Sequence, residues 1–300
     1  MAPIPDLTLS KDDPDLFKFQ KSSARASLMD ILKVRSTDTR VEAILSWALD
    51  KLAASNDRRL TILSEILLDL PNYENGEEIF DGANAMAEKL GAKLKAAIIT
   101  DENLKKDNHT DISSLFKPKR KKARISVIYA KELGSTTEQE IFIGNLIMEI
   151  FSWLSRNPGP GGLAGLLVID EAKDLAPSRE STSAKAPIVR YASQARKYGY
   201  GLIIASQMFK SIDHNIVGNC DSLFVGRQGS GSAATAAEEM LGIKNKIANL
   251  EPTNYAVKVN SVVPNKVNWM KSAMCLSHHP SKAPDRDKIL EMAYKSREFV

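Results

Sequence analysis

The sequence has 300 residues, of which 43% are hydrophobic and 26% are charged, a balance typical of a folded globular protein and not of a disordered chain. Its formal net charge of +4 at pH 7 does not by itself indicate binding to nucleic acid or to a membrane. The two cysteines, Cys220 and Cys275, lie far apart without a CxxC pattern, so neither a disulfide framework nor a zinc site is indicated. No run reaches the ~18 apolar residues of a membrane span and no targeting segment is visible, so we expect a cytoplasmic protein.

The first part of the chain has the residue spacing of amphipathic helices. In RVEAILSWALDKLA, one helical face is shared by Val41, Ile44, Leu45, Ala48 and Leu52. The pattern continues through Leu60 to Leu70 and, after a turn, through GEEIFDGANAMAEKLGAKLKAAI. We therefore expect an α-helical region over residues 1–122, which ends in a polar, exposed loop.

That loop carries a basic run, KPKRKKAR. Its cations are Lys117, Lys119, Arg120, Lys121, Lys122 and Arg124. Such a cluster can neutralise phosphates of a DNA backbone and so give salt-dependent binding. The alternative is a solvated loop, and only Phe116 is interleaved with the cations, so base stacking is not indicated.

The pattern changes at Ala123. Four short apolar runs predict buried strands, namely ARISVIYA, GLLVID, GLIIAS and SLFVGR. Helical spacing lies between them, over residues 138–153 and 186–198. Strands that alternate with helices of these lengths predict an α/β fold with a mostly parallel, doubly wound sheet over residues 123–300.

The segment LLVIDEAKDL contains the strongest chemical signal. Its apolar residues lead directly into two adjacent acids, Asp170 and Glu171. A buried strand that ends in this way places both carboxylates at the carboxyl edge of the sheet, where α/β folds bind ligands. The alternative is that the two acids only begin a loop or cap the next helix.

A second segment, ASQARKYGYGLIIASQ, leads from a basic helix end through glycine into an apolar strand that closes on Gln207. Together with LLVIDEA and the tail LEPTNYAVKVN, it resembles the HerA/FtsK superfamily of ring-forming P-loop ATPases, especially HerA-like DNA translocases and helicases. The resemblance covers about residues 120–295. It implies the Walker B half of a RecA-like P-loop ATPase core, preceded by a helical insert over residues 1–122, and a C-terminal hairpin followed by a helix.

The resemblance also implies residue roles. Asp170 would hold the Mg²⁺ of bound ATP, Glu171 would polarise the attacking water, and Gln207 would sense the γ-phosphate. Arg196 would act as an arginine finger in a neighbouring subunit, with Arg227 as the rival. Without the resemblance, Gln207 only ends a strand and Arg196 is a solvated helix terminus favoured by the helix dipole.

The sequence departs from the family in one respect, because it contains no GxxxxGK[ST] motif and no Gly-Lys pair. The glycine-rich stretch QGSGSAATAAEEMLG lacks the required lysine and predicts a turn before an alanine-rich helix. ATP and Mg²⁺ are therefore expected only when a missing Walker A half completes the site.

The resulting hypothesis is the C-terminal half of a hexameric DNA translocase. Its expected partners are DNA, a homo-oligomeric ring or a Walker A-containing chain, and a nuclease or another effector. The alternative is a truncated or pseudo-ATPase that serves as a non-hydrolysing assembly or binding module.

Overall fold

The computed structural model describes residues 7, 13–35, 37–55, 57, 59–72, 79–101, 104, 112–117, 123–130, 133–229, 231–264, 266–273 and 285–298. The chain divides into two compact units, one of Met1–Leu115 with Ser126–Cys220 and one of Phe116–Ile125 with Asp221–Val300. The predicted boundary between residues 122 and 123 stays a prediction about domains. Outside the described residues lie Cys275 and four cations of the basic run, Lys119, Arg120, Lys121 and Lys122.

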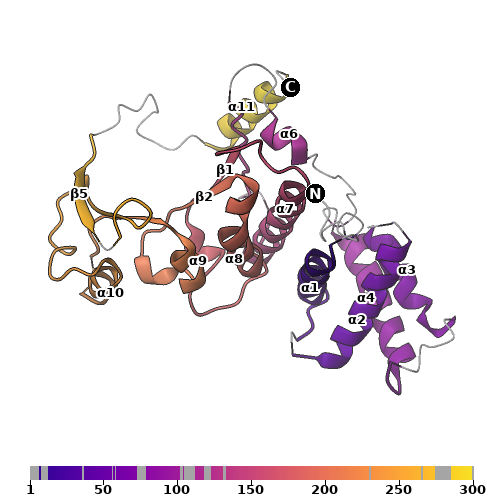
Figure 1. Cartoon of the computed structure of the whole chain (residues 1–300). Helices are drawn as coiled ribbons and strands as arrows, with labels where there is room; N and C mark the ends of the chain where they lie inside the picture. The colour runs from indigo at the N-terminus through magenta and orange to yellow at the C-terminus, as the bar shows by residue number, and fades with distance from the viewer. Residues whose placement is uncertain are drawn as a thin grey trace. The chain divides into compact units, whose positions relative to one another are not determined.

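The predicted helical first part is confirmed. It contains α1 (Pro14–Ile31), α2 (Thr39–Ala54), α3 (Leu60–Leu68), the 3₁₀ turn η2 (Leu70–Asn72) and α4 (Ala83–Thr100) (Figure 1). A short helix, α6 (Ile112–Phe116), follows. The buried leucine, isoleucine and alanine side chains of α1 to α4 pack into one core cluster, as their helical spacing predicts.

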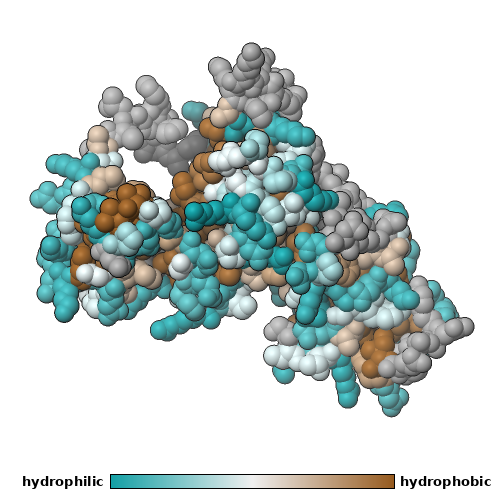
Figure 2. All heavy atoms as spheres, in the orientation of Figure 1, coloured by the Kyte–Doolittle hydropathy of each residue, from teal (hydrophilic) through white to brown (hydrophobic). Residues whose placement is uncertain are grey.

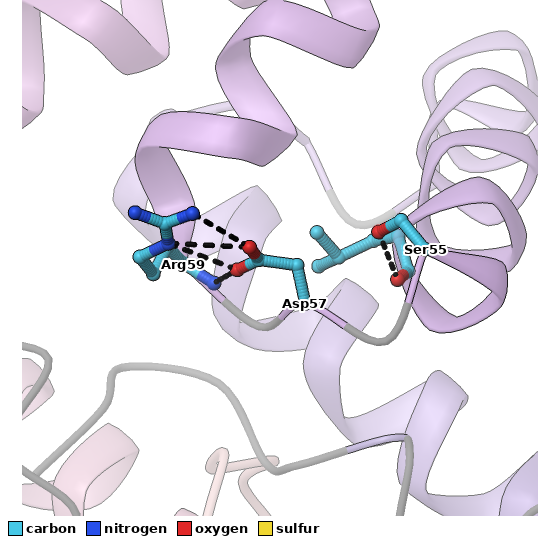
Figure 3. A network of polar contacts seen from close by, with 4 residues as sticks. Ser55, Asp57 and Arg59 are labelled. Carbon is cyan, nitrogen blue, oxygen red and sulfur yellow. Dashed lines mark hydrogen bonds and ion pairs between the residues drawn. The ribbon is translucent and has the colours of Figure 1, made fainter.

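The turn between α2 and α3 is held by local polar contacts (Figure 3). The Ser55 hydroxyl donates to the Leu52 carbonyl over 2.7 Å. The Arg59 guanidinium pairs with the Asp57 carboxylate at 2.7 Å. These contacts satisfy polar groups at the end of α2 and just before the start of α3.

Two helices of the later part follow their predicted positions, namely α7 (Thr136–Arg156) and α8 (Lys185–Gln194), which continues into the 3₁₀ turn η5 (Ala195–Tyr198). Three further elements were not predicted, namely the 3₁₀ turn η4 (Ala172–Asp174), the 3₁₀ turn η6 (Phe209–Ser211) and the helix α9 (His214–Asn219). A capping box begins α7, because Ser135 and Glu138 each accept a hydrogen bond from the other's backbone N–H. Helix α7 and helix α8 lie beside each other in Figure 1.

Two strands, β1 (Gly165–Ile169) and β2 (Tyr200–Ile204), pair in parallel with Ile169 opposite Ile204. Their amino ends are tied by the loops that precede them, since the Ala164 N–H donates to the Gly199 carbonyl over 2.7 Å. Gly199 has φ +84°, and a Cβ there would lie 2.9 Å from the Gly162 carbonyl oxygen. Glycine therefore supplies both the left-handed backbone and the close approach at this edge.

The prediction of one mostly parallel sheet is confirmed only for β1 and β2. The run SLFVGR does form a strand, β3 (Ser222–Val225), but it pairs antiparallel with β4 (Asn254–Val259), which pairs with β5 (Val267–Lys271). The expected alanine-rich helix is α10 (Gly231–Leu241), and the expected C-terminal hairpin and helix are β4 with β5 and α11 (Arg286–Glu298). The fold is thus mixed α/β, mostly helical, with one small parallel and one small antiparallel sheet.

The predicted buried strand over ARISVIYA is wrong. Residues 123–130 are not in a strand and make no ladder to another described residue, and the side chains of Ile125 and Val127 are 86% and 83% exposed. A β-branched run becomes a strand only when a partner accepts its backbone hydrogen bonds.

One face of the β1–β2 pair is uncovered. Leu166, Val168 and Ile203 lie on this face, at adjacent register positions, and are 45%, 59% and 50% exposed. Figure 2 shows apolar surface in this region. We refer to these three residues as the open face. Within the described residues, no helix has the length and hydropathy needed to span a membrane.

Candidate functional site

The predicted acid pair lies where β1 ends. Ile169 is the last residue of β1, and Asp170 and Glu171 follow it directly. The hydrogen-bond ladder continues past both strands, because the Ala205 N–H donates to the Ile169 carbonyl over 2.9 Å and the Ala172 N–H donates to the Ala205 carbonyl over 3.1 Å. The backbone after β2 is thereby fixed beside the two acids.

Glu171 and Gln207 meet at this edge. The Gln207 side-chain amide Nε2 donates a hydrogen bond to Oε1 of Glu171. The other carboxylate oxygen of Glu171, Oε2, is buried and has no hydrogen-bond partner among the described residues. A buried carboxylate oxygen without a donor is rare and costly, so it marks a position where a water or a ligand group would be stabilised.

The backbone of Glu171 is also unusual. Its φ of 51° and ψ of 42° place a non-glycine residue in the left-handed region. Such conformations cost about 1–3 kcal/mol and concentrate at functional sites. Here the conformation turns the chain between β1 and the 3₁₀ turn η4.

Asp170 is exposed at the same edge. Its Oδ1 accepts a hydrogen bond from the Glu171 N–H over 3.0 Å. In the part of the chain that the structure describes, no three His, Cys, Asp or Glu side chains form a metal-binding group. A single carboxylate nevertheless fits the Mg²⁺ of a nucleotide, because Mg²⁺ is commonly held by one or two carboxylates, water and the substrate phosphates.

The loops after β1 and β2 are tied together farther from the strands. The Ser178 N–H donates to the Ser211 carbonyl, and the Asp213 N–H donates to the Ala176 carbonyl, each over 3.0 Å. Burial would raise the pKa of Asp213, but hydrogen bonds from Lys185 and Asn215 outweigh it and hold this pKa below its usual range. The loop that carries Glu171 therefore has a rigid frame.

The predicted arginine lies at the opposite end of the strands. Arg196 is exposed in η5, just before β2, whereas Gln207 follows β2. At about 3.3 Å per residue, the five residues of β2 separate the two ends by roughly 16 Å. Arg196 is thus not brought together with Asp170, Glu171 and Gln207 in one chain.

The other predicted cations lie in the second unit. Arg227 is exposed after β3, and Lys117, the described lysine of the basic run, is exposed after α6. Neither is placed relative to the acid pair.

A further pocket in the first unit has no counterpart among the sequence motifs. It is lined by residues that include Phe19 of α1, Arg190 of α8 and Asn215 of α9. Residues so far apart along the chain carry no common motif, and only the packing of α1 against the later helices brings them together.

No family model matches the sequence, and no curated protein matches it. The chain is structurally similar to a genome packaging NTPase, B204 of Sulfolobus turreted icosahedral virus 2. For its complex with AMP, the identity is 15% and the TM-score 0.39, over 55% of this chain and 73% of that chain. For its complex with ATP-gammaS, the identity is 18% and the TM-score 0.38, over 56% of this chain and 74% of that chain.

Proposed function

We propose that this chain is part of an ATP-driven DNA translocase of the HerA/FtsK type, and that it supplies the acid pair and sensor of a nucleotide site whose phosphate-binding loop comes from another segment. In this proposal the chain hydrolyses ATP only in the completed assembly. The function is that of a motor subunit, with DNA as the substrate that is moved.

The observation that carries the proposal is the arrangement of Glu171. Its carboxylate is positioned by Gln207 at the carboxyl edge of two parallel strands, and its remaining oxygen is buried without a partner among the described residues. This arrangement supports a role in which the carboxylate accepts a proton or orients a water, because Gln207 holds one oxygen and the other has no partner among the described residues.

The neighbouring residues complete the chemistry. Asp170 would hold the Mg²⁺ of the nucleotide, which would neutralise charge on the phosphates. Glu171 would orient the attacking water, and Gln207, bound to Glu171, would couple its position to the γ-phosphate. None of these residues supplies positive charge or backbone amides to the phosphates, so a P-loop is still required.

The open face supports a second segment at this sheet. Leu166, Val168 and Ile203 are apolar and exposed, and within the described residues β1 and β2 ladder only with each other. Parallel strands are normally buried on both faces, so this part of the fold has room for a further helix and a further strand. A Walker A-bearing segment would bring both.

The experiment compares the chain alone with the chain co-expressed with the Walker A-bearing segment encoded upstream or by a neighbouring gene. We expect no appreciable ATP hydrolysis by the chain alone. In the complex, Glu171→Gln should preserve nucleotide binding and lower turnover by at least about 10²-fold, the scale of a positioned acid–base group.

Asp174→Asn is the matched control, because Asp174 is an exposed carboxylate in the same loop, immediately after the site. Its turnover should stay near wild type. Magnesium-dependent hydrolysis by the chain alone would contradict the need for a second segment, and equal rates for Glu171→Gln and wild type would make Glu171 structural.

A second candidate is a non-hydrolysing assembly module. The absence of GxxxxGK[ST] from the sequence favours it, and so does the open face, which suits a binding surface as well as half of a catalytic core. If the complex binds a partner through β1 and β2 but never hydrolyses ATP, this second function replaces the first.

A further inference from the structure

The first unit contains a pocket of about 560 Å³ that none of Asp170, Glu171 and Gln207 lines. It lies between α1, the start and outer face of α8, and α9. Its lining includes Phe19, Lys185, Val189, Arg190, Gln194 and Asn215. The pocket is wide open to solvent, so a ligand bound there would stay partly exposed.

Arg190 is the unusual residue of this pocket. Its guanidinium carbon lies 4.4 Å from the centroid of the Phe19 ring and 5.1 Å from that of Phe151. These contacts fix the guanidinium through its faces and leave its N–H groups, which lie in the plane, available for hydrogen bonds.

Those N–H groups have no partner among the residues that the structure describes. Nε of Arg190 is buried without a hydrogen bond, and no ion pair or hydrogen bond joins the guanidinium to any described side chain or carbonyl. Burial lowers the pKa of Arg190, and Asp13, Tyr198 and Asp15 oppose this shift without forming an ion pair or hydrogen bond with the guanidinium. Leaving the buried Nε unpaired is costly, and the terminal N–H groups of the guanidinium can donate to water or to an acceptor group in the pocket.

The acid that lines the pocket does not serve as that acceptor. The Asp213 carboxylate is already paired with Lys185 Nζ at 2.9 Å, and it also accepts the Asn215 N–H over 2.8 Å. Lys185 Nζ donates in addition to the Glu180 carbonyl over 3.0 Å. Of the two cations that line the pocket, Lys185 is thus paired, and Arg190 has no hydrogen-bond acceptor among the described residues.

We propose that this pocket binds an oxyanion group of a small ligand, with Arg190 as the principal donor. A phosphate or carboxylate has two oxygens that match the fork of a guanidinium, and the pair forms two parallel, charge-assisted hydrogen bonds. Phe19 and Phe151 hold the fork in place, and the remaining volume accommodates the body of the ligand. The site is separate from the proposed nucleotide site and does not depend on it.

The first experiment uses the wild-type full chain. An arginine-selective dicarbonyl reagent is applied at constant ionic strength, and labelling of individual arginines is followed by peptide mass spectrometry. Millimolar inorganic pyrophosphate or malonate should slow the labelling of Arg190. Arg40 is the internal control, because it also stacks on a ring, Phe80 at 5.7 Å, but does not line the pocket.

Slower labelling with pyrophosphate assigns a phosphate-bearing ligand, and slower labelling with malonate alone assigns a carboxylate. Equal labelling of Arg190 with and without both anions overturns the proposal. Slowing of Arg190 and Arg40 to the same extent also overturns it, because the effect would then be general screening.

Calorimetric titration of variants gives an independent measurement. Arg190→Gln should weaken binding of the protecting anion at least about tenfold, the loss expected for charge-assisted hydrogen bonds, whereas Arg40→Gln should bind as wild type. Val189→Trp, which fills the pocket and retains Arg190, should also abolish binding. Unchanged affinity in a folded Arg190→Gln or Val189→Trp variant overturns the proposal. If neither variant folds, the labelling experiment on the wild-type chain decides the proposal by itself.

Discussion

Two costs coincide at Glu171, a left-handed backbone and a buried carboxylate oxygen without a donor among the described residues. Neither is needed to end a β-strand, because a glycine would adopt this backbone freely and a serine would leave no buried carboxylate oxygen. Residues held in unfavourable conformations concentrate at functional sites. The two features of Glu171 therefore support its proposed role, in addition to the hydrogen bond from Gln207.

Glu238 shows the opposite case, a carboxylate whose hydrogen bonds are satisfied. Its two oxygens accept the backbone N–H groups of Asn245, Lys246 and Ile247 over 2.9, 2.7 and 2.8 Å. The hydrogen bonds from these three amides lower the pKa of Glu238. The carboxylate thus anchors the loop after α10 in its charged form.

This anchor predicts a pH dependence. Because the folded pKa of Glu238 is depressed, its contribution to stability is present above the unfolded value of about 4.3 and is lost as pH falls through the folded pKa. In Glu238→Gln, amide hydrogen exchange over residues 245–247 should be faster than in wild type at pH 7. The difference in exchange rate between Glu238→Gln and wild type should shrink once the pH falls below the pKa of this carboxyl group in the unfolded chain.

Glu239→Gln is the control for this prediction, since Glu239 is the exposed neighbour on the same helix. It should exchange as wild type at every pH. Equal exchange in Glu238→Gln and wild type at pH 7 would show that the loop is held by other contacts.

At the scale of elements, the amino edge of β1 and β2 depends on Gly199. We expect Gly199→Ala to destabilise the first unit by more than the roughly 1–2 kcal/mol cost of a left-handed alanine, because its Cβ would also meet the Gly162 carbonyl. Urea denaturation followed by circular dichroism measures the free energy of unfolding.

Gly82→Ala separates the two causes. Gly82 has a similar φ of +82° in the same unit, but a Cβ there would meet no atom within 4 Å. Gly82→Ala should therefore lower the free energy of unfolding only by the cost of the left-handed backbone. Equal losses in both variants would mean that the loop around Gly162 gives way and that the close approach is not important.

Elements with a strong local signal could be predicted from the sequence. The capped, periodic stretch that became α7 and the apolar runs of β1 and β2 carry their own information. ARISVIYA carries the same strand signal, yet it forms no strand, because pairing depends on a partner elsewhere in the chain or assembly. The direction of β3 could not be predicted for the same reason, since alternation along a strand does not say which neighbour it has.

In the candidate site, too, local features could be predicted from the sequence and contacts between distant segments could not. The position of Asp170 and Glu171 at a strand end could be predicted from LLVIDEA, because it depends only on local order. The bond from Gln207 to Glu171 depends on how two loops pack, which sequence spacing does not specify. Arg190 could not be singled out from the sequence, because its aromatic partners, Phe19 and Phe151, lie on other helices.

At the scale of the whole assembly, the position of Arg196 restricts its proposed role. It lies at the amino end of β2, away from the acid pair of its own chain, so as a finger it would act only on the nucleotide of a neighbour. That requires a head-to-tail contact of the kind that closes rings. Mixed complexes test this directly.

We predict that mixing completed subunits that carry Arg196→Ala with subunits that carry Glu171→Gln restores ATP turnover above that of either parent. A Glu171→Gln subunit still offers its arginine to a neighbour with an intact acid, so some sites become complete. The gain should approach the ~10³-fold scale of an arginine finger, diluted by the fraction of complete sites. If native gels show mixed rings and no gain occurs, Arg227 becomes the candidate for the same experiment.

DNA binding by the assembly is expected to depend on the basic run. Replacing its cations, including Lys117 and Arg124, by alanine should reduce the slope of log affinity against log salt, by about 0.9 for each duplex DNA phosphate that the protein no longer neutralises. Filter binding across a salt series measures this slope. An identical slope would assign the run to a solvated loop.

The open face also has a consequence inside a cell. A chain made in excess of the proposed partner would display Leu166, Val168 and Ile203 next to strand edges that are unpaired within the described residues, and chaperones and proteases recognise such features. Unassembled copies would then be removed, and the steady-state amount of the chain would follow that of its partner. The stoichiometry of the assembly would thus be set by degradation of the orphan subunit and would not require matched synthesis.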